Sequence, residues 1–138
     1  MPYPEYLTAP MREELTTLGV EECRTAEAVD TAVKADGVVM MVVNSVCGCA
    51  AGKARPGLTM ALRHSVRPDV IASVFAGFDI EATDRARSYF DGYAPSSPSM
   101  AILHHGKLVY MLERRDIEVS GSMAIADRLQ AAIKEYCS

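Results

Sequence analysis

The sequence lacks the features that mark membrane, exported and nucleic-acid-binding proteins. Its run of valine and methionine at residues 38–43 is six residues long, whereas a membrane-spanning helix needs about 20 apolar residues. Lysine and arginine are scattered and the net charge is −4, so no basic surface for nucleic acid is expected. The first five residues are polar and include two prolines, unlike an export signal. We therefore expect a cytoplasmic protein that binds neither membranes nor nucleic acids.

The sequence also lacks several common catalytic patterns. It has no Ser-His-Asp order, no glycine-rich loop for phosphate and no prominent pair of carboxylates. No repeat or linker divides its 138 residues, of which 49% are apolar and 23% charged. A chain of this length and composition can bury a full hydrophobic core. We predict a single domain over residues 1–138, in which residues 1–19 form an N-terminal extension that includes a helix.

The chain does contain four cysteines. Without export, such a set more often serves redox or metal chemistry than structural disulfides. Cys47 and Cys49 are separated only by Gly48 and follow the apolar run directly. A zinc site prefers four ligands, and no second pair with a similar spacing completes one. The other candidates for metal binding are Cys23, Cys137, His64, His104 and His105. We predict no metal site, and a metal shared between two subunits is the alternative.

The surroundings of Cys47 favour a reactive thiol. The run at residues 38–43 is apolar throughout, which is typical of a central parallel strand buried on both faces. A helix should follow, so its free N–H groups and the positive end of its dipole would face Cys47 and stabilise the thiolate. Lys53 and Arg55 would add positive charge if they point the same way. We therefore expect a lowered pKa at Cys47.

The remaining patterns predict an alternation of strands and helices. An irregular lead-in precedes a helix that begins near Thr8, and Thr25 and Asp79 can cap two later helices. A further helix is expected over residues 49–65, interrupted near Pro56 because proline removes a backbone hydrogen bond. Strands are expected at residues 20–23, 38–43, 70–76, 100–104 and 108–113, the last two forming a hairpin, and a final helix covers residues 125–136. This order predicts an α/β fold with a mixed sheet between helices.

Four segments together point to a known family. They are residues 44–52 (Asn-Ser-Val-Cys-Gly-Cys-Ala-Ala-Gly), 54–56 (Ala-Arg-Pro), 75–77 (Phe-Ala-Gly) and 93–99 (Tyr-Ala-Pro-Ser-Ser-Pro-Ser). With the order of elements, they resemble the bacilliredoxin family, which are thioredoxin-like proteins with a Cys-Gly-Cys motif. The resemblance covers nearly the whole chain. It implies a thioredoxin-like fold with an extra N-terminal helix.

The resemblance also implies an activity and a set of site residues. The implied enzyme removes bacillithiol, or a similar small thiol, from protein mixed disulfides, and disulfide isomerase activity is implied as well. Cys47 would be the attacking cysteine and Cys49 its partner, while Ser97-Pro98 matches the cis-proline position of the thioredoxin fold. We assign substrate binding to Asn44, Ser45, Gly48, Arg55, Ser97 and Pro98. The expected partners are client proteins that carry disulfides, with bacillithiol as co-substrate, no bound cofactor, and a monomer or weak homodimer.

Other functions stay open on the sequence alone. The Cys-Gly-Cys pair could serve a general disulfide isomerase or reductase, a metal-binding module or a redox sensor. Either Cys49, Cys137 or a second small thiol could resolve an adduct on Cys47. Asn44 and Ser45 could orient the cysteine loop or only satisfy its backbone.

Overall fold

The computed structural model describes residues 5–63 and 66–137, so His64 lies outside the described residues. The elements in chain order are α1 (Glu5–Thr16), β1 (Glu21–Glu22), α2 (Ala26–Val33), β2 (Val38–Asn44), the π-helix η1 (Ala50–Ala54), α3 (Arg55–Ala61), β3 (Val70–Phe75), α4 (Ile80–Ser88), β4 (Ser99–His104), β5 (Lys107–Leu112), α5 (Arg114–Glu118) and α6 (Ser122–Cys137). In the described ranges, no helix is both long and apolar enough to span a membrane.

The strands form one mixed sheet, as predicted. Its order is β1-β3-β2-β4-β5, with β1, β3 and β2 parallel and β4 and β5 antiparallel to their neighbours. The hairpin between β4 and β5 turns at His105 and Gly106, whose φ angles are +53° and +77°, as a tight two-residue turn requires. Since β2 lies between β3 and β4 in the sheet, the residues that follow its carboxyl end have a strand on each side.

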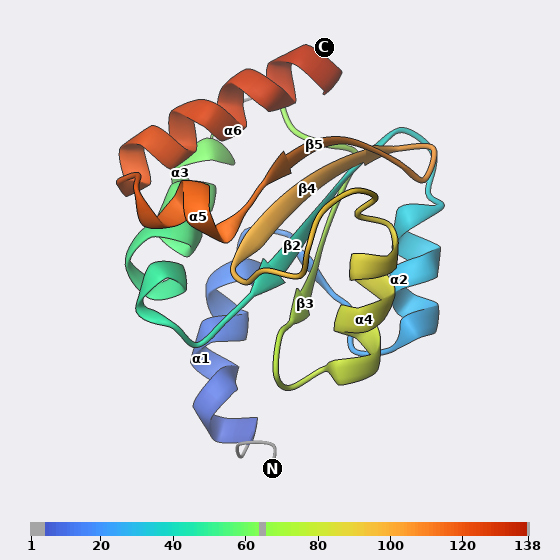
Figure 1. Cartoon of the computed structure of the whole chain (residues 1–138), viewed down its shortest axis with the longest axis horizontal. Helices are drawn as coiled ribbons and strands as arrows, with labels where there is room; N and C mark the ends of the chain where they lie inside the picture. The colour runs from blue at the N-terminus through green and yellow to red at the C-terminus, as the bar shows by residue number, and fades with distance from the viewer. Residues whose placement is uncertain (1–4, 64–65, 138) are drawn as a thin grey trace.

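Strand β2 is buried on both faces, which confirms the prediction from its apolar run. Side chains alternate along a strand, so Met40 and Val42 face one core and Met41 and Val43 the other. Helices α3 and α6 pack on the first face, together with Leu15 of α1. Helices α2 and α4 cover the second face (Figure 1). The sheet is thus enclosed between two layers of helices.

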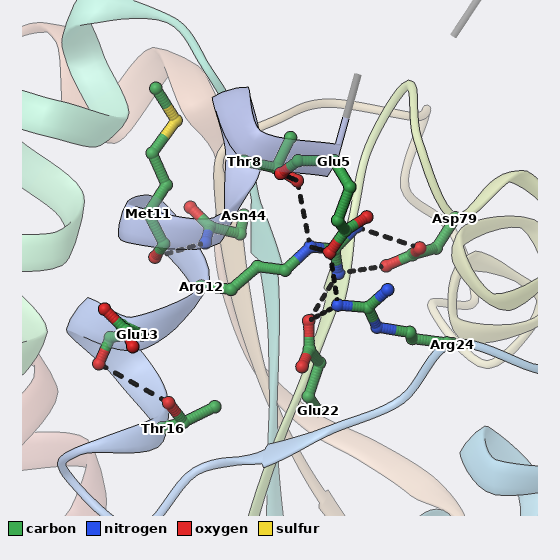
Figure 2. Close-up of polar contacts among 10 residues, drawn as sticks. All are labelled: Glu5, Thr8, Met11, Arg12, Glu13, Thr16, Glu22, Arg24, Asn44 and Asp79. Atoms are coloured by element: carbon green, nitrogen blue, oxygen red, sulfur yellow. Dashed lines mark hydrogen bonds and ion pairs between the residues drawn. The ribbon is translucent and has the colours of Figure 1, made fainter. Parts of the chain in front are cut away.

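Helix α1 is fastened to the domain by a buried arginine (Figure 2). Arg12 has a side chain only 6% exposed, and it contacts Glu22 of β1 at 2.5 Å and both carboxylate oxygens of Asp79 at 2.8 and 3.1 Å. Its guanidinium also lies 4.9 Å from the centre of the Phe75 ring. These contacts join helix α1 to β1 and to the residue before α4.

Two sequence predictions need correction, and one helix was not predicted. Helix α1 begins at Glu5 instead of Thr8 and contains Pro10 in its interior, because its tertiary contacts compensate for the missing hydrogen bond. Asp79 occupies the N-cap position of α4 but makes no capping bond, since its carboxylate binds Arg12. The short helix α5 was not predicted; a capping box of Glu113 and Asp116 begins it. By contrast, Thr25 caps α2 as predicted, accepting the N–H of Ala28.

Candidate active site

The two neighbouring cysteines lie where β2 ends and the next helix begins. Cys47 and Cys49 are both free thiols and partly exposed. The carbonyl of Cys47 accepts hydrogen bonds from the N–H groups of Ala50 (3.1 Å) and Ala51 (3.2 Å). Cys47 therefore sits at the N-terminal end of the helical segment, and the N–H groups of Cys49 and Ala50 in its first turn also favour the Cys47 thiolate.

The helix after the cysteines opens with a π-helical segment. Residues 50–54 are π-helical, and the N–H of Arg55 donates to the carbonyl of Ala50, five residues back. Pro56 follows directly, and it has no N–H for the regular ladder. The predicted interruption near Pro56 is therefore confirmed, in the form of a π segment, a feature common at functional sites. The predicted end at residue 65 lies outside the described residues, and α3 itself ends at Ala61.

The pKa of Cys47 is lowered, as predicted. Partial burial by itself would raise it, but several groups that favour the thiolate outweigh the burial. They are the hydroxyl of Ser45, the backbone N–H groups of Ala50 and Cys49, and the positive charge of Arg114. The same Ser45 hydroxyl accepts the Cys47 N–H at 3.2 Å, so its own proton is free to point at the sulfur. A hydroxyl, two amides and one guanidinium together make this thiol acidic.

The cation beside the thiol is not one of those expected from the sequence. Lys53 donates to the carbonyl of Glu118, and Arg55 is directed into the protein. Arg114, at the start of α5, instead supplies the charge that acts on Cys47. The sequence signal was the charged segment at residues 113–116, directly after the hairpin, but only the fold brings it to the cysteines.

The loop before β4, residues 93–98, is the proline loop. It lies at the same end of the sheet as the cysteines, because Ser99 at the start of β4 pairs with Val43 near the end of β2. The Ser97-Pro98 peptide bond is cis, which confirms the geometry predicted for this position. Pro98 is buried and lines a small space together with Asn44 and Arg55. The carbonyl of Ser97 accepts a hydrogen bond from Arg114 at 3.1 Å. Arg114 therefore links the proline loop to the surroundings of Cys47.

The other residues assigned to substrate binding lie at different depths. Asn44 and Arg55 are each 3% exposed and Ser45 is 8% exposed, so these three lie beneath the cysteine loop. Gly48 is exposed, its φ is not positive, and an added Cβ would meet nothing within 4 Å. The backbone of the reduced pair therefore does not require glycine at this position.

The two remaining cysteines lie apart from this pair. Cys23 is 3% exposed, and burial, together with nearby Glu21, raises its pKa to about 11. Cys137 ends α6, and burial raises its pKa as well. Among residues 5–63 and 66–137, no three histidine, cysteine or acidic side chains group as metal ligands would. His104 and His105 are exposed at the hairpin turn, with ring centroids 4.1 Å apart.

Comparison with known proteins gives the family. A family model described as "Disulphide isomerase" matches residues 3–137. A bacilliredoxin of Koribacter versatilis (strain Ellin345) is 56% identical over 136 residues, which cover 98% of this chain and 94% of that protein. A bacilliredoxin of Staphylococcus aureus (strain NCTC 8325) is 49% identical over 126 residues, covering 91% and 87%.

Solved structures show the same fold at low sequence identity. The thioredoxin of Malassezia sympodialis (Mala s 13) superposes with a TM-score of 0.58 at 16% identity, covering 86% of this chain and 91% of that one. Mitochondrial thioredoxin 3 of Saccharomyces cerevisiae gives 0.57 at 15% identity, covering 85% and 95%. The chain therefore belongs to the bacilliredoxin family, and it is a thiol–disulfide oxidoreductase with a thioredoxin-like fold.

Proposed function

We propose that this protein removes bacillithiol, or a similar low-molecular-weight thiol, from the mixed disulfides of client proteins, and that Cys47 is the attacking group. The observation that carries the proposal is the position of Cys47 at the mouth of a helical segment, where a hydroxyl, backbone amides and Arg114 favour its thiolate. The thiolate is the form of cysteine that attacks disulfides. The names of the two bacilliredoxin relatives support the choice of thiol.

The first step transfers the small thiol to the enzyme. The Cys47 thiolate attacks the bacillithiol sulfur of the mixed disulfide, and the bond to the client cysteine breaks. The client sulfur leaves as a thiolate and takes a proton from solvent. One disulfide bond is lost and one is formed, so this step needs no external oxidant or reductant.

Two routes can release the adduct. In one, the deprotonated Cys49 attacks the Cys47 sulfur and bacillithiol leaves as a thiolate. The resulting ring over Gly48 departs from preferred disulfide geometry and should be readily reduced by two electrons from a reductant. In the other, a second small thiolate attacks the bacillithiol sulfur, and it frees Cys47 and carries the disulfide away. Besides these two routes, the partly exposed Cys137 could attack the Cys47 sulfur of a second molecule, since it lies apart from the pair in its own.

The proline loop and the residues under the cysteines contribute to substrate binding in this proposal. A client segment would lie across Gly48 beside Ser97 and Pro98, and extended segments commonly bind through backbone hydrogen bonds. The Ser97 carbonyl already accepts from Arg114, so a client would share or displace that bond. Asn44, Ser45 and Arg55 support the surface from below. The enzyme would act in the cytoplasm, where small thiols keep it reduced. It would need no bound cofactor and would be a monomer or weak homodimer.

Mass spectrometry of the protein after incubation with a bacillithiolated client tests this proposal. We expect an adduct of bacillithiol mass on Cys47, together with a free client thiol. Cys47→Ser should abolish client release, whereas the matched Cys23→Ser variant should not, because Cys23 is buried away from the pair. Release at an unchanged rate after Cys47→Ser, or no adduct on the wild-type protein, contradicts the proposal.

A second candidate is general disulfide isomerase activity, which the description of the matching family model favours. Reactivation of a scrambled disulfide protein, measured beside client release, separates the two functions. Isomerisation needs no small thiol on the substrate. A faster rate on scrambled disulfides than on bacillithiolated clients would therefore favour the isomerase.

A further inference from the structure

Ser45, which contacts Cys47 directly, has both of its backbone polar groups fixed by buried neighbours. Its N–H donates to Oδ1 of Asn44 at 2.9 Å, and its carbonyl accepts from Nη1 of Arg55 at 2.8 Å. The same Nη1 donates to Asn44 Oδ1 at 3.0 Å. Three hydrogen bonds therefore close a small network beneath the cysteine loop.

This network is tied in turn to helix α1. Nε of Arg55 contacts Oε2 of Glu14 at 2.5 Å. The amide of Asn44 donates to the backbone carbonyl of Met11 at 3.3 Å, and Figure 2 shows it pointing toward that carbonyl. Met11 and Glu14 are three residues apart, so they lie on one face of the helix. Helix α1 thus holds both members of the network that fixes Ser45.

We propose that Arg55 is a positioning residue for the attacking thiol: by joining Glu14 of α1 to the side-chain oxygen of Asn44 and the backbone carbonyl of Ser45, it holds the Ser45 hydroxyl against Cys47. Arg55 is 3% exposed and points away from the cysteine surface, so it acts through Ser45. Lysine cannot replace it, because the three acceptors need the fork of the guanidinium. The proposal rests on Cys47 being the attacking group.

The pH profile of Cys47 alkylation by iodoacetamide tests the positioning role. Arg55→Lys keeps the charge but loses the fork, so we expect the midpoint to rise by about half a unit to one unit, as the loss of one hydrogen bond to the thiolate predicts. Glu14→Met should also raise it, since the anchor on α1 is lost. If Glu14 acted only through its charge, Glu14→Met would lower the midpoint instead, because removing a carboxylate favours the thiolate. Glu13→Met, on the exposed neighbouring position, is the matched control for charge and should not raise the midpoint.

The double variant shows whether Arg55 acts through Ser45. Ser45→Ala alone should raise the midpoint. Adding Arg55→Lys to it should produce little further rise, because both changes remove the same contact, that of the Ser45 hydroxyl with Cys47. Circular dichroism confirms that each variant is folded. An unchanged or lower midpoint in Arg55→Lys and Glu14→Met, or fully additive shifts in the double variant, overturns the positioning role. If wild-type Cys47 itself fails to accept bacillithiol, the proposed function fails instead.

Discussion

At the scale of single residues, the acidity of Cys47 results from opposing effects. Burial favours the neutral thiol, whereas the Ser45 hydroxyl, two backbone amides and Arg114 favour the thiolate. The favourable groups come from two segments far apart in sequence, the loop after β2 and the start of α5. The thiol therefore depends on the tertiary fold for part of its reactivity.

Removing the distant charge should weaken the thiol measurably. Arg114→Gln is expected to raise the alkylation midpoint of Cys47 by a few tenths of a pH unit, because a partly exposed charge is screened by water and salt. The difference from wild type should shrink as salt is added. Arg115→Gln, whose side chain is 82% exposed, is the control with the same loss of charge. Equal shifts in both variants would mean that Arg114 acts only through net charge.

The sequence predicted the position of Cys47 and Cys49 after the buried strand but not all of their surroundings. The apolar run, the Cys-Gly-Cys spacing and the proline loop are local patterns, so the positions of Cys47 and Pro98 could be predicted. Arg114 could not, because its approach to Cys47 depends on how the hairpin returns to the sheet. Lys53 and Arg55 were expected to add charge at the thiol, but a spacing in sequence does not show which side of an irregular helix a residue occupies.

At the scale of elements, α3 depends on a close approach to α6. A Cβ added at Gly57 would lie 2.6 Å from Cγ2 of Ile125 and 3.1 Å from the carbonyl of Ser122. No ordinary side chain fits such a gap. Glycine at this position therefore allows the helix after the cysteines to pack directly on α6.

Filling that gap should destabilise the domain. We expect Gly57→Ala to lower the free energy of unfolding by about 1–3 kcal/mol, as measured by urea denaturation, because the packed interface must shift. Gly52→Ala in the preceding π segment is the matched control, since an added Cβ there meets nothing within 4 Å. It should leave stability unchanged or slightly raised, since alanine is the better helix former. A loss in Gly57→Ala no larger than that in the control would contradict close packing.

Element types were predictable where the pattern was strong and local. The buried strand β2, the Thr25 cap and the hairpin turn follow from residue types within a few positions. The start of α1 does not, and α5 is only five residues long, with a local signal limited to the capping box of Glu113 and Asp116. The π segment was partly predictable: proline indicates an interruption of the helix, but the form of that interruption depends on packing.

At the scale of the whole molecule, Arg12 joins elements that are distant in sequence. Its partners Glu22 and Asp79 lie on β1 and before α4, so one side chain connects α1 with both. The order of elements and the parallel strands could be predicted from the sequence. This connection could not, because a helix pattern gives no sign that a charged residue will be buried.

Removal of the buried arginine should therefore cost much more than removal of an exposed one. Arg12→Ala removes the arginine that binds both oxygens of Asp79 and leaves Glu22 with Arg24 alone, and we expect a loss of about 2–4 kcal/mol in the free energy of unfolding. Arg24→Ala is the control, because Arg24 contacts Glu5 and Glu22 with a side chain that is 47% exposed. It should cost about 1 kcal/mol or less. Equal losses in the two variants would show that Arg12 is not the central anchor.

Cys47 is expected to be an accessible thiolate near neutral pH because of the groups that the fold places around it. The most direct test of this expectation is the alkylation rate of the individual cysteines in the reduced wild-type protein between pH 5 and about 9, followed by mass spectrometry of peptides. A lowered pKa means that the thiolate persists toward lower pH, so Cys47 should react first near neutrality, with a midpoint below the ~8.5 of a free thiol. Cys137 should react later and Cys23 last, since burial raises the pKa of both. A midpoint for Cys47 at or above that of a free thiol, or faster reaction of Cys137, would contradict the account.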